Sequence, residues 1–120
     1  MERDLAPSLT HLERMCGVHG IVQFCSGNEP DLDSGYCLDD NVRLLVLAVS
    51  ILEDDRSNAF ALEAGNSVFD FIAQASAGAP VYHNMMDQHG RFTDRFASPE
   101  SIGRLINALG VVMRDSHEPT

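Results

Sequence analysis

Residues 35–43, GYCLDDNVR, and the apolar run LLVLAVSIL at residues 44–52 decide the fold of this chain. The pattern predicts a helix that begins at Asp39 or Asp40, either of which can cap it, and that ends near Asp54. Because this helix is apolar nearly all round, we expect it to be the central buried helix. The two carboxylates, the amide, the guanidinium and the aromatic ring at its head indicate a polar cavity.

Three further helices are predicted from apolar residues at helical spacing. One covers residues 8–16, one covers residues 57–75, and one opens at residues 98–101, where Ser98 can cap it, and continues to Val112. The expected inner faces are Phe60, Leu62, Val68, Phe69 and Ile72 in the third helix, and Ile102, Leu105, Ile106, Leu109 and Val112 in the fourth.

The connections between these helices contain little regular structure. Residues 17–38 are punctuated by Gly, Ser, Asn and Pro and read as one long loop, in which only residues 21–24 are extended. Residues 81–96 predict a short β-hairpin around a Gly-containing turn. We therefore expect a mainly α-helical single domain over residues 1–120, with an ordered core at 8–114 and flexible tails at 1–7 and 115–120.

The charge balance excludes several classes of partner. Eighteen acidic residues oppose eight basic ones, which are all Arg, and give a formal net charge of −10. A negative field of this size repels phosphate backbones, so nucleic acid and anionic membranes are not expected partners. No segment approaches the ~20 apolar residues that span a bilayer. A domain of this size buries only about two-thirds of its unfolded surface, which favours a homo-oligomer.

The cysteines indicate a reducing compartment and no metal site. Cys16, Cys25 and Cys37 are an odd number without a secretory signal before them, so free thiols in the cytoplasm are expected. Cys16 and His19 have a ligand-like spacing, but the paired C-x-x-C ligands of structural zinc sites are missing. Nucleotide-binding loops and hydrolase motifs are absent too, so we expect no cofactor.

Six segments of the chain resemble a known family in their order and spacing. Residues 11–14 (HLER), 20–23 (GIVQ) and 35–43 (GYCLDDNVR) are similar to a bacterial α/α-toroid domain, six-hairpin glycosidase-like, that is attached to or encoded beside glycosyltransferases. Later segments of that domain are similar to YHNMM at residues 82–86, RFTD at 91–94 and SPESIGRL at 98–105. The similarity covers about residues 9–114, and the motif at 35–43 is its most specific part.

The resemblance implies a ring of helical hairpins whose inner helices present polar side chains to a sugar-sized cavity. The ring of the family is several times longer than this chain, so we expect a shortened relative that forms part of an α/α toroid-like array. Ile102 stands where the family has a histidine, and Pro99-Glu100 replaces an acidic pair, which favours a non-catalytic role.

The expected function is that of a small accessory module that binds a carbohydrate or a sugar derivative. Its expected ligand-binding residues come from the head of the central helix, from the hairpin and from the start of the fourth helix. They are Tyr36, Asp39, Asp40, Asn41, Arg43, Asn84, Asp94 and Glu100.

Two other functions remain open from the sequence. A glycoside hydrolase would require Asp39 or Asp40 to face Glu100 across the scissile bond. A purely structural oligomerisation module would instead use the aspartates as helix caps and ion-pair partners. The expected ion pairs are Arg43 with Asp39 or Asp40, and Arg104 with Glu100 or Asp94.

Overall fold

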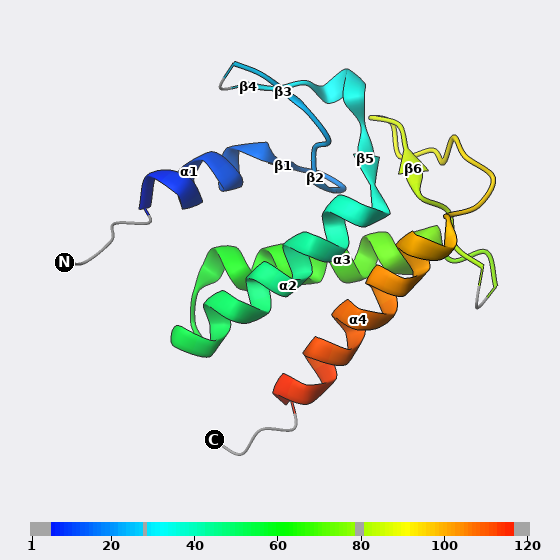
Figure 1. Cartoon of the computed structure of the whole chain (residues 1–120). Coiled ribbons are helices and arrows are strands. Elements are labelled where there is room, and N and C mark those ends of the chain that lie inside the picture. Colours follow the sequence, from blue (N-terminus) through cyan, green and yellow to red (C-terminus); the bar gives the residue numbers. More distant parts are fainter. Residues whose placement is uncertain (1–5, 28, 79–80, 117–120) are drawn as a thin grey trace.

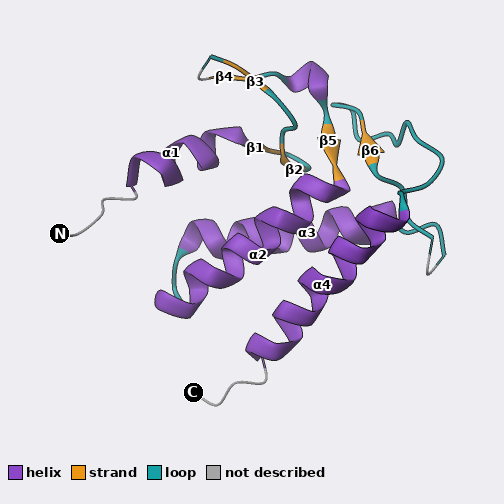
Figure 2. Cartoon of the chain, in the orientation of Figure 1, coloured by secondary structure: helices purple, strands orange, loops and turns teal. Residues whose placement is uncertain are grey.

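The computed structural model describes residues 6–27, 29–78 and 81–116, and this part of the chain is mainly helical. Four α-helices are accompanied by short strands that lie at one end of the helical layer (Figure 1; Figure 2). The helices are α1 (Ala6–Met15), α2 (Leu38–Asp54), α3 (Ala59–Ala75) and α4 (Pro99–Ser116). The strands are β1 (Cys16–Gly17), β2 (Gly20–Ile21), β3 (Cys25–Ser26), β4 (Glu29–Pro30), β5 (Tyr36–Cys37) and β6 (Met85–Met86), and a 3-10 turn covers Leu32–Ser34.

The α2 helix is the centre of the fold, as predicted. It packs against both α3 and α4, and apolar residues of all three helices form one core with β5 and β6. Leu38 and Leu45 of α2, Phe71 of α3 and Met86 of β6 are the largest apolar side chains that are almost completely buried there. This packing fixes how α4 crosses the head of α2.

The long connection before α2 has more structure than predicted. Two antiparallel ladders, β1–β2 and β3–β4, follow each other within it, and the 3-10 turn comes next. Ladders of two residues give no alternation of polar and apolar residues long enough to be read from the sequence. The expectation of a single irregular loop over residues 17–38 is therefore wrong.

The predicted hairpin exists in part, but its main partner is a distant strand. Met86 and Phe92 form an antiparallel bridge around a turn at residues 87–90. The strand β6 itself pairs with β5, with Tyr36 opposite Met86 and Cys37 opposite Met85. The pairing brings the loop before α4 to the head of α2.

Some helix boundaries and faces differ from the predictions. Residues 6–7 and 115–116, expected in flexible tails, belong to α1 and α4, while residues 1–5 and 117–120 lie outside the described residues. Leu62 and Phe69 of α3 are exposed, and so is Ile106 of α4. Small residues take their place in the core, because Ala61, Ala64 and Ala108 allow the helices to approach closely.

Within the described residues, no helix combines the length and the apolar character that crossing a membrane requires.

Candidate functional site

The backbone at the head of α2 is capped by residues outside the helix. Asn84 Oδ1 accepts hydrogen bonds from the N–H groups of Leu38 at 2.9 Å and Asp39 at 3.4 Å. The N–H of Asp40 donates to Cys37 Sγ at 3.5 Å. The prediction that Asp39 or Asp40 caps this helix is therefore wrong, and both carboxylates lie inside its first turn.

Asn84 is itself held in place by Asp94. The carboxylate of Asp94 accepts the N–H of Asn84 at 2.8 Å and the N–H of Met85 at 2.9 Å. The carbonyl oxygen of Asp94 lies 3.0 Å from His83 Nδ1. Asp94 thus fixes the loop that carries the cap of α2, and we assign both residues to this support rather than to ligand contact.

Asn41 is fully buried and ties α2 to the β1–β2 ladder. Its Oδ1 accepts the N–H of Ile21 at 3.2 Å, and its Nδ2 donates to the carbonyl of Cys37 at 3.1 Å. Gly20 has φ +101°, and any Cβ at that position would collide with Asn41 Oδ1. No surface of Asn41 is left for a ligand, so we remove it from the site.

Tyr36 is 3% exposed and faces the N-terminal ladder. Its ring meets His19 edge-on at a centroid distance of 5.3 Å. A Cβ at Gly17 would lie only 2.6 Å from the hydroxyl oxygen of Tyr36. A buried ring cannot stack on a sugar that arrives from solvent. Tyr36 therefore leaves the site as well.

An ion pair joins the head of α2 to α4. Arg104 Nη1 lies 3.3 Å from Asp39 Oδ2. The expected pairing of Arg104 with Glu100 or Asp94 is wrong, because α4 crosses α2 at the level of Asp39. Asp39 Oδ1 is shielded from solvent and has no hydrogen-bond partner among the described residues.

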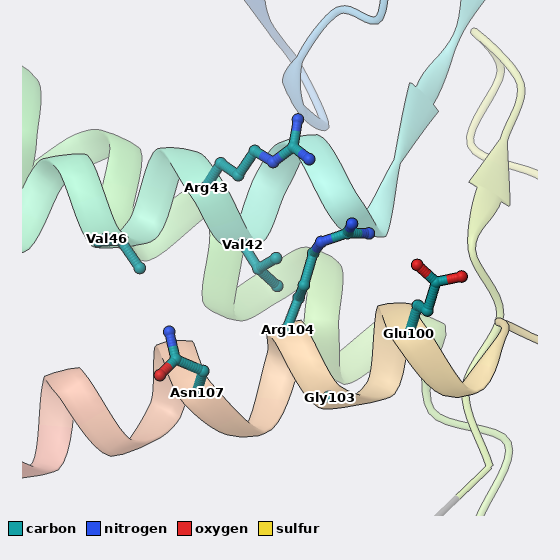
Figure 3. Close-up of a pocket in the computed structure, with 7 residues that line it drawn as sticks. All are labelled: Val42, Arg43, Val46, Glu100, Gly103, Arg104 and Asn107. Atoms are coloured by element: carbon teal, nitrogen blue, oxygen red, sulfur yellow. The ribbon is translucent and has the colours of Figure 1, made fainter.

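A groove of about 580 Å³ lies between α2 and α4, next to this ion pair. Figure 3 shows Arg104 and Asn107 reaching from α4 toward α2, whereas Arg43 points away from α4 at the rim. The lining residues are Val42, Arg43 and Val46 from α2, and Glu100, Gly103, Arg104 and Asn107 from α4.

The sequence predicted only part of this groove. Arg43 and Glu100 were expected as ligand contacts, whereas Asn107 was missed and Arg104 was expected only in an ion pair. Positions 100, 103, 104 and 107 share one side of a helix, and this spacing was the signal that could have found them. The expected ion pair of Arg43 with Asp39 or Asp40 is not among those formed by the described residues.

A second hollow of about 290 Å³ lies beside Asp40, between α1 and α2. Apart from Asp40, Arg43 and Gln23 its lining is apolar, with contributions from Leu12, Met15, Ile21, Val22, Leu44 and Leu47. Asp40 and Glu100, one of the two pairs that hydrolysis could use, therefore line different hollows.

The thiols nearest to the head of α2 are held in their neutral form. Burial raises the pKa of Cys37 to about 12 and, together with the charge of Glu13, the pKa of Cys16 to about 11. A raised pKa is the opposite of what activates a cysteine nucleophile. Within the described ranges, no group of three or more His, Cys, Asp or Glu side chains could hold a metal ion.

Comparisons with protein-family models, with curated proteins and with solved structures find no match for this chain. Arg104, Asn107 and Glu100 of α4 give the groove between α2 and α4 its polar side chains on that helix, and Arg43 lies at its rim.

Proposed function

We propose that the groove between α2 and α4 binds a small carbohydrate or a sugar derivative, and that the chain is a non-catalytic accessory module. The single observation that carries this proposal is the combination of polar side chains and two valines around one groove of about 580 Å³. This volume lies within the range of about 300–1,000 Å³ that small-molecule sites occupy.

The lining of the groove matches the two kinds of surface that a sugar presents. Hydroxyl groups require donors and acceptors, which Asn107, Arg104 and Glu100 supply. The C–H face of a pyranose requires an apolar surface, which Val46 supplies, because Val42 beneath it is only 2% exposed. The ion pair with Asp39 orients the guanidinium of Arg104 before a ligand arrives, and this lowers the entropic cost of binding.

The positions of the carboxylates favour binding over hydrolysis. A glycosidase needs two carboxyl groups about 5–9.5 Å apart on either side of one bond. Here Asp40 and Glu100 line different hollows, and Asp39 is engaged by Arg104. In this proposal the unit of α2, α3 and α4 represents part of an α/α toroid-like array that has kept a binding surface.

Isothermal titration calorimetry with a panel of neutral, acidic and phosphorylated mono- and disaccharides tests the proposal. We expect at least one sugar to bind. Asn107→Ala should raise the dissociation constant for that sugar about tenfold or more, because the exposed amide that contacts the sugar is lost. Asp40→Ala, outside the groove, is the matched control and should bind as the unsubstituted chain does.

Two results would overturn the proposal. One is the absence of binding for the whole panel while circular dichroism shows a folded protein. The other is the reverse pattern, in which Asp40→Ala loses binding and Asn107→Ala keeps it, because the hollow between α1 and α2 would then be the site.

A further inference from the structure

The outer face of α4 carries exposed apolar side chains and no acidic residue. Between Glu100 and Asp115 the helix carries no acidic residue, although the chain has 18. Ile106 is 66% exposed and Met113 is 61% exposed. The solvent face of a surface helix is normally polar, so exposed apolar side chains at helical spacing require an explanation.

Two glycines lie on the same side of the helix as these apolar residues. Gly103, Ile106, Gly110 and Met113 follow one another at intervals of three and four residues, which places them on one face. A Cβ built at Gly103 or Gly110 would meet no heavy atom within 4 Å. Gly103 also lines the groove between α2 and α4. At neither position does glycine relieve a steric clash within the chain, and glycine weakens a helix interior.

We propose that α4 pairs with α4 of a second copy of this chain, antiparallel and about a two-fold axis at the level of Ala108. In this register Ile106 of one copy lies opposite the second copy's Gly110, and Met113 lies opposite Gly103. Every large side chain therefore meets a position without a side chain, and the symmetry repeats each contact. The glycines let the two helices approach closely.

The charges on the edge of this face agree with the same register. Glu100 lies eight residues before the axis and Arg114 six residues after it. In this arrangement, the positions of Glu100 in one copy and Arg114 in the other differ by only about 3 Å along the helix axis. Two symmetric ion pairs result, and no acidic residues face each other between them. This limits the local repulsion between two copies that each carry a formal net charge of −10.

Figure 1 shows α4 at the edge of the helical layer, with α2 and α3 on its inner side. The inner residues Leu105 and Ala108 are buried in the core. Occupation of the outer face thus leaves this core unchanged. It engages Glu100 and Gly103, however, which also line the groove between α2 and α4, so the dimer and a ligand in the groove compete for these two residues.

Sedimentation velocity of the full chain over a concentration series tests the proposal. We expect a reversible dimer that is favoured by higher salt, and Ile106→Glu should raise its dissociation constant at least about tenfold, because each dimer contains this contact twice. Leu62→Glu is the matched control: Leu62 is 47% exposed on α3, and its substitution should leave the dimer intact. Circular dichroism of both variants verifies that the helices are retained.

Charge reversal tests the register. Arg114→Glu should weaken the dimer by placing two acidic residues together, and the addition of Glu100→Arg should restore it. A chain that stays monomeric at all concentrations and salt levels would overturn the proposal. So would a dimer that survives Ile106→Glu, or one that the second substitution fails to restore.

Discussion

Asn41 is the residue on which the local structure at the head of α2 depends most directly. Its fully buried amide satisfies the N–H of Ile21 and the carbonyl of Cys37. Asn41→Ala leaves the N–H of Ile21 without this acceptor and removes one donor from the carbonyl of Cys37, so we expect the free energy of unfolding to fall by about 1–3 kcal/mol. Urea denaturation measures this, and Asn66→Ala, an exposed position on α3, should change stability by less than about 0.5 kcal/mol. Equal effects of the two substitutions would contradict the role assigned to Asn41.

The three thiols should differ widely in reactivity. Cys25 is exposed, whereas burial raises the pKa of Cys16 to about 11 and of Cys37 to about 12. The thiolate is the reactive form, so at pH 8 the raised pKa values alone should slow these two thiols about 100-fold or more relative to an ordinary thiol. Labelling with a disulfide reagent should show one fast phase, which Cys25→Ser removes. A fast phase that persists in this variant would show that another thiol is accessible.

The same pKa shifts imply that the fold loses stability in alkali. A thiol that ionises at 9.0 in the unfolded chain and at about 12 in the folded chain stabilises the fold fully only below pH 9. Above that pH the unfolded state loses its proton first, so stability falls between about pH 9 and pH 12. Melting temperatures from pH 7 to pH 10 should therefore decline, and Cys37→Ala should show a smaller decline. A decline of the same size in Cys37→Ala would assign the effect to other groups.

Among the elements, α2 is unusual because a residue 46 positions away caps it. Asn84 accepts two N–H groups at the start of α2, whereas Asn58 caps α3 locally by accepting the N–H of Ala61 at 3.0 Å. We expect Asn84→Ala to lower the free energy of unfolding by about 0.5–1 kcal/mol, the lower part of the range for loss of a cap, because the N–H of Leu38 keeps the backbone carbonyl of residue 84 as an acceptor at 2.8 Å. Asn58→Ala is the local comparison in the same denaturation experiment. No measurable loss for Asn84→Ala would mean that the side chain of Asn84 contributes nothing to the head of α2.

The helices could be predicted from the sequence because their signals are local. Apolar residues recur at helical spacing, and Ser98 accepts the N–H of Ser101 at 3.2 Å as its position before Pro99 indicated. The inner face of α3 was harder, because Leu62 and Phe69 are more hydrophobic than the alanines that are buried instead. The close approach of α2 and α3 decides which residues of α3 are buried. This approach depends on how the two helices pack together and not on the sequence of either helix alone.

The candidate site could be predicted only in outline. The polar residues at the head of α2 were correctly placed at the start of a buried helix, but their partners depend on contacts between distant segments. Arg104 meets Asp39 because α4 crosses α2 there, and Asn84 reaches the helix because β6 pairs with β5. Such contacts between distant segments leave no periodic pattern in the sequence. The residues at 35–43 were therefore predicted as one ligand site, although several of them hydrogen-bond the protein backbone instead.

At the scale of the whole molecule, repulsion between acidic residues opposes the folded state. The formal net charge is −10, and the ion pairs of the described residues, such as Arg104 with Asp39 and Arg91 with Asp87, are partly exposed and contribute little. Raising the salt concentration from about 0.01 M to 0.15 M shortens the screening length from about 30 Å to 8 Å, so NaCl should raise the melting temperature. Asp54→Lys replaces a negative charge in the last turn of α2, where the helix dipole disfavours negative charge, with a positive one. This variant should have a higher melting temperature in low salt, and its melting temperature should depend less on the salt concentration. Differential scanning calorimetry at the two salt concentrations measures both effects. A melting temperature that falls as salt is added would show instead that attractive ion pairs outweigh the repulsion.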